Sequence, residues 1–256
     1  MQILRQMPSS VFVLSLFALW MSARAGVFFR NRSRRNIEGA VEDLGLVLAA
    51  TLTLLGLIIG FSFSMAINRY DQRKHYEEEE ANAIGTEYLR ADLLHEADAA
   101  KLKLLLVRYL DQRVLFYRTR DSAALQQVSR STRKLEVDLW SAVYAPAALL
   151  ATPVAALAVA GMNDVINSNG YTQAAWWNRI PVAAWILMGA IAVSANFLTG
   201  YAMRRQTAGG LLLVMLPLIV SVSFFLIADI DSPRGGAIRV QPQNLLSLSE
   251  SLRGER

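Results

Sequence analysis

The densest group of side chains suited to chemistry is the acidic run Glu77–Glu80, which shares one polar stretch with Asp71. Rings of carboxylates concentrate cations in cation channels, and this is one interpretation of the run. The other is a solvated helix face whose carboxylates pair with Arg73 and Lys74 at helical spacing. We favour the solvated face, because charge runs on helices ordinarily face water.

Two pairs of side chains have the types that bind metals. His75 and Glu79 are spaced to share one helix face, but a metal site needs further ligands and His95 shares no motif with them. Asp229 and Asp231 could ligate Ca²⁺, which takes about six to eight oxygens, but no dense acidic run surrounds them. We therefore expect no metal site and no cofactor, and we interpret the two aspartates as polar caps at the end of an apolar helix.

No catalytic signature occurs in the sequence. The chain lacks H-E-x-x-H, G-x-S-x-G and P-loop motifs, and it has no cysteine to serve as nucleophile or thiolate ligand. Its long apolar runs contain no charged residue, which argues against a buried proton relay or a charge-coupled carrier. We therefore expect a protein that is not an enzyme.

The elements that must position these residues are apolar helices. The chain has 256 residues, of which 54% are hydrophobic and 18% charged, below the roughly 25% charged of soluble domains. Four uncharged runs are candidates to cross a hydrocarbon core of about 30 Å. They lie at about 7–23, 44–66, 181–201 and 211–228. The sequence therefore predicts an all-α, multi-pass membrane protein with four transmembrane helices and a helical extramembrane domain between spans 2 and 3.

The predicted domains follow from these runs. They are a transmembrane hairpin in 1–66, a helical extramembrane domain in 67–178, a second transmembrane hairpin in 179–230 and a polar tail in 231–256. The net charge of +5 fits orientation and anionic lipid in a membrane protein better than nucleic acid. We expect membrane lipid as a partner, no nucleic acid, and a location in the cell (inner) membrane.

Two apolar segments have a second interpretation. Segment 7–23 imitates a cleaved signal peptide, but the arginines that follow, beginning with Arg24, resist translocation, so we favour a retained span. Segment 142–161 is uncharged and could be a fifth span. Because alanine dominates it and Pro146 and Pro153 interrupt it, we favour a buried or interfacial helix there.

The second span has features that a simple anchor does not need. No proline follows it, so we expect its helix to continue into water through Asn68–Gln72. It carries four hydroxyl side chains and two closely spaced glycines, namely Thr51, Thr53, Ser62, Ser64, Gly56 and Gly60. Small residues allow helices to approach closely in lipid, and hydroxyls bond across helices or face a cavity. We predict that this helix packs against copies of itself or neighbouring spans, or lines a path.

Amphipathic helices are predicted between the second and third spans. From Ala99 onward, apolar residues recur at i, i+3, i+4 and i+7, at Leu102, Leu105, Leu106, Tyr109, Leu110 and Val114. Segment 121–140 has a similar stripe, at Leu125, Val128, Leu135 and Leu139. Each helix must bury this face in a helical bundle or against another subunit.

The second span resembles the second transmembrane helix of the bestrophins. It carries Gly60-Phe61-Ser62-Phe63-Ser64 and then Arg69-Tyr70, where bestrophins have Gly-Phe, a later Ser and then Arg-Trp. In the tail, Asp231-Ser232-Pro233-Arg234-Gly235 is similar to the acidic-Pro-x-Gly turn of bestrophins, and Asn244-Leu245 to their later Asn-Asp-Leu-Pro. With the run Glu80–Thr86, the chain most resembles the bestrophin-like group of bacterial integral membrane proteins.

The resemblance implies a homopentamer whose second helices line an axial pore for inorganic ions, mostly anions in the animal members. The apolar neck of that pore falls here on Thr53, Leu57 and Phe61, with Ser64 one turn further, although Thr53 departs from the bulky apolar residue expected. The expected function is an oligomeric, anion-conducting ion channel. The alternative is a non-conducting membrane scaffold or sensor whose helical domain binds a partner.

Two arguments about membrane orientation point in opposite directions. Basic residues lie near the span ends on both sides of the membrane in almost equal number. Because the positive-inside rule weights short loops most, it slightly favours cytosolic connectors, with residues 67–178 outside the cytosol. The resemblance to bestrophins implies instead that the large helical region is cytosolic.

Overall fold

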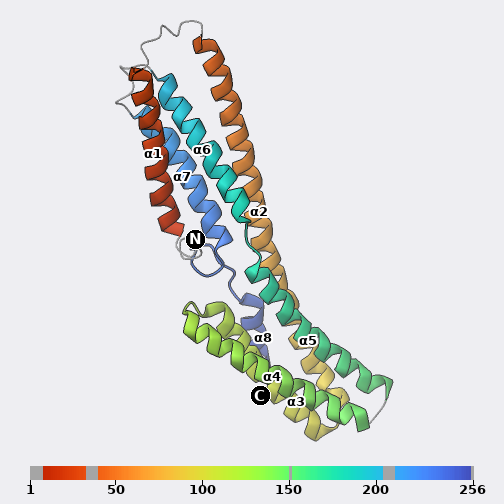
Figure 1. Ribbon diagram of the computed structural model, residues 1–256. Coiled ribbons are helices and arrows are strands. Elements are labelled where there is room, and N and C mark those ends of the chain that lie inside the picture. The colour runs from red at the N-terminus through yellow and green to blue at the C-terminus, as the bar shows by residue number, and fades with distance from the viewer. Residues whose placement is uncertain (1–7, 33–39, 150–151, 204–210, 255–256) are drawn as a thin grey trace. The chain divides into compact units, whose positions relative to one another are not determined.

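The computed structural model describes residues 8–32, 40–149, 152–203 and 211–254, and the regular elements of these ranges are helices (Figure 1). In chain order they are α1 (Pro8–Arg32), α2 (Ala40–Arg90), the short 3₁₀ turn η2 (Ala91–Leu93), α3 (Glu96–Arg118), α4 (Ser122–Leu149), α5 (Pro153–Trp177), α6 (Val182–Ala202), α7 (Leu212–Asp231) and α8 (Gln243–Gly254). Helical segments long and apolar enough to cross a membrane lie in Pro8–Arg32, Asp43–Leu93, Pro153–Ala202 and Leu213–Asp231. The all-α fold with four transmembrane helices is therefore confirmed.

The chain forms two compact units. The first, which we call the membrane unit, comprises Met1–Tyr70 and Arg179–Arg239, so that among the described helices it holds α1, the apolar part of α2, α6 and α7. The second, the helical unit, comprises Asp71–Asn178 and Val240–Arg256 and holds the polar part of α2 with α3, α4, α5 and α8. The predicted continuation of the second span beyond its apolar run is confirmed, since α2 is one helix of 51 residues.

The core of the membrane unit is built from all four of its helices. Leu19 of α1, Leu55 of α2, Met188 of α6 and Ile227 of α7 belong to one cluster of buried side chains. Helix α1 lies beside both α6 and α7 (Figure 1). Many apolar side chains on the outer faces, Phe17 and Ile186 among them, are exposed, as expected for helices solvated by lipid.

Helices α1 and α6 cross at two glycines. A Cβ at Gly26 would overlap the backbone oxygen of Phe197, and a Cβ at Gly200 would overlap that of Ala23, so both positions need a residue without a side chain. Beyond the crossing, Arg30 Nη1 donates hydrogen bonds to the carbonyls of Tyr201 at 2.7 Å and of Ala202 at 3.0 Å. These bonds satisfy carbonyls at the end of α6, where the helix itself offers no donor.

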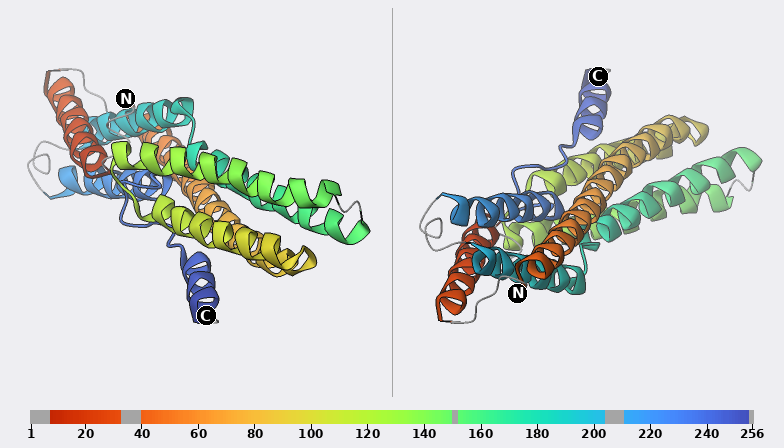
Figure 2. Two further views of the ribbon diagram at one scale, coloured as in Figure 1. Left: turned by 90° about the horizontal axis from the view of Figure 1, so that it is seen from below. Right: turned by 90° about the horizontal axis from the view of Figure 1, so that it is seen from above.

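The helical unit buries the predicted stripes. Leu102, Leu106 and Tyr109 of α3 have no exposed surface, and Leu139 of α4 is equally buried. Helix α4 lies beside α3 and α5 (Figure 2). Segment 142–161 is divided between the end of α4 and the beginning of α5, both in the helical unit.

The polar tail predicted for 231–256 differs from the structure. Its first part, to Arg239, belongs to the membrane unit, whereas the remainder belongs to the helical unit and contains α8. Leu245 and Leu252 of α8 are buried, and Leu248 approaches Gly85 of α2. The apolar stripe of this helix is only two turns long, which makes it a weak signal in sequence.

We predict that Gly200→Ala destabilises the membrane unit by about 1–3 kcal/mol, because its methyl group would push the α1 and α6 backbones apart. Gly189→Ala, on the same helix, is the matched control, since a Cβ there meets nothing within 4 Å. The measurement is the midpoint of thermal unfolding in one detergent. Equal midpoints for the two variants would contradict the crossing described here.

Candidate functional site

The apolar half of α2 has one face turned into its own unit and one turned away. Leu55, Ser62 and Ala66 are buried. At about 100° per residue, the four predicted pore residues lie on the opposite side of the helix. All four are exposed, with 52% exposure at Leu57 and 63% at Phe61; the other two are Thr53 and Ser64. The described chain therefore leaves the predicted stripe uncovered.

The predicted packing glycines lie beside this stripe. Gly56 and Gly60 are exposed, and a Cβ at either would meet no described atom within 4 Å. The described spans of the same chain therefore do not use the close approach that these glycines permit. Thr53 stands where a bulky apolar residue is expected. Its hydroxyl donates a hydrogen bond to the carbonyl of Ala49 at 2.9 Å, so its only side-chain donor is satisfied within the helix and the side chain is less polar toward its surroundings.

The residues of the bestrophin-like motif near the end of the apolar run lie at the edge of the membrane unit. Tyr70 is half-buried and packs against the core cluster. Arg69 is also half-buried, and its Nη2 lies 3.7 Å from the sulfur of Met65.

The aspartates at the end of α7 hold backbone. The carboxylate of Asp229 accepts hydrogen bonds from the N–H groups of Ala237 and Ile238, both at 2.8 Å, and Asp231 accepts one from Ile180 at 3.0 Å. Both aspartates therefore anchor the backbone of neighbouring segments, and none of these hydrogen bonds is to the end of α7 itself. Of the motif residues that follow Asp231, Pro233 is buried and Gly235 exposed. The glycine that the turn requires is Gly236, where a Cβ would overlap the carbonyl of Asp229.

Asn244 of the same motif lies in the helical unit, where it meets Glu77 of α2. Its side-chain amide donates to Glu77 Oε2 at 2.7 Å, and the backbone N–H of Leu245 donates to Glu77 Oε1 at 3.0 Å. A carboxylate at the first turn of α8 is stabilised by the unpaired N–H groups and the dipole of that helix. Burial raises the pKa of Glu77, and these hydrogen bonds act against the increase.

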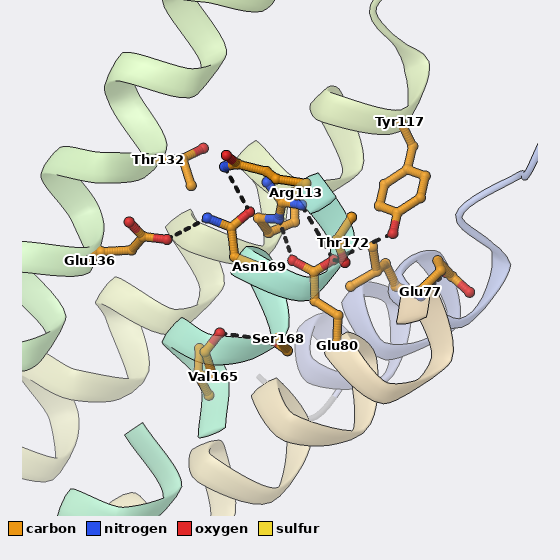
Figure 3. Close-up of polar contacts among 12 residues, drawn as sticks. Glu77, Glu80, Arg113, Tyr117, Thr132, Glu136, Val165, Ser168, Asn169 and Thr172 are labelled. Atoms are coloured by element: carbon orange, nitrogen blue, oxygen red, sulfur yellow. Dashed lines mark hydrogen bonds and ion pairs between the residues drawn. The ribbon is translucent and has the colours of Figure 1, made fainter. Parts of the chain in front are cut away.

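A second buried carboxylate, Glu80, collects partners from two other helices (Figure 3). It forms an ion pair with Arg113 of α3, whose Nη2 also donates to Glu80 Oε2 at 3.3 Å. The hydroxyls of Tyr117 and Thr172 donate to the same oxygen at 3.4 and 3.3 Å. Glu80 and Arg113 are 0% and 1% exposed. Charges so deeply buried are tolerated only when hydrogen bonds replace the lost water, as they do here.

Aromatic rings enclose this ion pair. The Arg113 guanidinium lies 4.5 Å from the centroid of Phe116, which packs edge-on against Tyr117 and Trp176. Burial acts to lower the pKa of Arg113, but Glu80 outweighs it, so the pKa stays above its ordinary value. Burial and the charge of Glu80 together raise the pKa of Tyr117. The guanidinium of Arg113 is therefore charged, and the phenol of Tyr117 neutral, throughout the physiological range.

Both interpretations of the acidic run Glu77–Glu80 are wrong for its first and last residues. Glu77 and Glu80 are buried and bonded within the helical unit, while Glu78 and Glu79 are exposed. His75 Nε2 lies 3.2 Å from Glu79 Oε1, an exposed pair within one helix. Over the described ranges no three His, Cys, Asp or Glu side chains come together as a metal site.

This architecture is similar to that of known proteins. The family model of the Bestrophin-like domain matches residues 12–245. Two crystal structures of variants of a bacterial bestrophin homologue from Klebsiella pneumoniae superpose with a TM-score of 0.64 at 12% and 13% identity, covering 95% and 94% of this chain and 94% and 98% of the homologue. A further structure of that homologue gives a TM-score of 0.59 at 13% identity, covering 94% of each chain. Comparison with curated proteins gives no match.

The fold is thus that of a multi-pass, all-α membrane protein of bestrophin architecture. The family match extends from α1 into α8, through both units. The chain belongs to the bestrophin-like family.

We predict that Arg113→Met and Glu80→Met each destabilise the helical unit by about 3–5 kcal/mol, because each leaves one buried charge without its partner. The double variant should lose clearly less than the sum, since it removes both charges. The measurement is denaturant unfolding of the full-length protein, arranged as a double-mutant cycle.

The control for this cycle is the exposed pair of Lys103 and Asp92, whose charged atoms lie 2.6 Å apart. Replacing Lys103 by Met should cost about 0–1 kcal/mol, as is usual for surface ion pairs. Comparable losses at the two pairs would show that burial of Glu80 and Arg113 has no energetic consequence.

Proposed function

We propose that this chain is the subunit of a bestrophin-like ion channel, a homo-oligomer in the cell (inner) membrane whose α2 helices line an axial path for anions. The observation that carries the proposal is the uncovered stripe of α2. Leu57 lies nearly opposite the face that α2 buries in its own unit, and Phe61 lies one turn further along the same outer side. A ring of such helices would turn one stripe from each copy toward a common axis.

The chemistry of the stripe fits a gate better than a binding site. Rings of leucine and phenylalanine shed water and so close a narrow path without any charged group. No charged residue lies in α2 between 44 and 66 that would bind a permeating ion tightly. The exposed Gly56 and Gly60 leave room for neighbouring α2 helices to approach closely. If the bestrophin architecture extends to the assembly, the ring is a pentamer.

The burial of two glutamates of the acidic run Glu77–Glu80 supports conduction of anions rather than cations. Glu77 and Glu80 are buried and bonded in the helical unit, so they are withdrawn from any acidic ring. This removes half of the feature that would have favoured cations.

A second function, that of a non-conducting scaffold or sensor, is favoured by one observation on the helical unit. A largely apolar hollow of about 600 Å³ lies between α4 and α5 and is lined by Trp140, Tyr144 and Val159 among others. Leu149 and Leu157 nearby are also exposed. Exposed apolar surface of this kind is typical of a site that binds another protein.

The test is ion flux through the purified protein in liposomes under chloride or sodium gradients. We expect chloride flux that rises severalfold in Leu57→Ala, because a smaller side chain widens and wets the apolar constriction. Leu187→Ala on α6 is the matched control, with 50% exposure against 52% at Leu57. It should leave flux unchanged.

Other outcomes would assign the function differently. Sodium flux without chloride flux would overturn anion conduction. Absence of flux from folded oligomers in both gradients, in the wild type and in Leu57→Ala, would favour the scaffold or sensor, and monomers without flux would end the channel proposal.

A further inference from the structure

One buried carboxylate of the helical unit is held differently from the others. Glu87 of α2 is 0% exposed, yet neither of its oxygens has a hydrogen-bond partner among the described residues. The other two buried glutamates of α2, Glu77 and Glu80, both accept hydrogen bonds, as does the half-buried Glu136 of α4. A carboxylate anion without donors is costly to bury, whereas a neutral carboxyl group is much less so.

Helix α5 approaches this carboxyl group through a glycine. A Cβ at Gly161 would overlap Glu87 Oε2 and come within 2.5 Å of Arg90 Nη1. Gly161 is itself buried, so the carboxyl group lies directly against the backbone of α5. The close approach of α2 and α5 at this point therefore depends on whether Glu87 is neutral or is an anion that needs hydrogen-bond donors.

The charged groups that act on Glu87 are few. Arg90, on its own helix, lowers the pKa of Glu87, and Asp164 of α5 raises it. Arg90 Nη1 lies 4.0 Å from Asp164 Oδ2, and both side chains are partly exposed. On the adjoining elements, Asp92 of η2 pairs with Lys103 of α3, and Arg113 of α3 pairs with Glu80.

We propose that Glu87 is a proton-dependent switch in the packing of α5 on α2. In the neutral form its carboxyl group lets α5 rest on α2 at Gly161. When the proton passes to water, the resulting carboxylate has no donor in place, and it draws Arg90 away from Asp164 while α5 separates locally from α2.

The direction of the pH dependence follows from the protonation equilibrium. Burial raises the pKa of Glu87 from the ordinary 4.5 to about 8, with Arg90 opposing and Asp164 reinforcing the increase. Because the packed form binds the proton more tightly than the opened form, the stability of the contact is fully present below pH 4.5. It is lost as the pH rises toward and through about 8.

The test is amide hydrogen exchange of the full-length protein at several pH values, corrected for intrinsic exchange rates. Protection of the α5 amides around Gly161 should fall by up to about tenfold per pH unit between about pH 5 and 8, the limit for opening linked to one proton. In Glu87→Gln, which is nearly isosteric and stays neutral, this dependence should disappear. Glu78→Gln, an exposed glutamate on the same helix, should behave as the wild type.

A second variant separates a switch from a merely structural carboxyl group. Asp164→Asn removes a charge that raises the pKa of Glu87 in the packed form, so the loss of α5 protection should level off at a lower pH and be smaller in total. Protection that is independent of pH in the wild type, or a dependence that persists in Glu87→Gln, would overturn the proposal. These readouts do not involve ion flux, so they stand whether or not the chain conducts ions.

Discussion

The constraint on which the helical unit depends is the acidic stripe that α2 buries in it. Glu77, Glu80 and Glu87 recur at helical spacing and are each no more than 1% exposed. Buried carboxylates need either donors or a proton, and the surrounding helices differ in which of these they supply. Helix α8 brings an amide and a backbone N–H to Glu77, and α3 and α5 bring Arg113 and Thr172 to Glu80. Glu87 meets a glycine instead.

In its apolar half, α2 buries apolar side chains on one face and leaves apolar side chains exposed on the other. There α2 contributes buried side chains, such as Leu55 and Ala66, to a core cluster shared with α1, α6 and α7, and leaves Leu57 and Phe61 outside. The same architecture is found in the bacterial homologue, and the chain belongs to the bestrophin-like family. The pore residues remain a proposal that rests on this uncovered face.

The apolar patterns within single helices predicted the fold well. Side-chain contacts between residues distant in sequence were not predicted. The apolar runs and the stripe of α3 carried enough signal for four spans and a helical unit. The acidic run was misinterpreted because local spacing suggests Arg73 and Lys74 as partners, while the observed partners of Glu80 lie 33 and 92 residues away. One available signal was Arg113 itself, a charged residue three positions after Leu110 and therefore on the buried stripe of α3. The glycine crossing of α1 and α6 likewise joins residues with no local pattern.

The position of α8 in the chain has a consequence for biosynthesis. Glu77 accepts its hydrogen bonds from Asn244 and Leu245, which follow α7 in sequence. These two donors therefore leave the ribosome only after both helices of the second hairpin have been made. Until then the polar part of α2 carries an uncapped carboxylate, and the bundle around it is incomplete. Completion of the helical unit is thereby tied to the end of membrane insertion, and a nascent chain that stalls before α8 would present an unfinished surface that quality-control proteases and chaperones recognise.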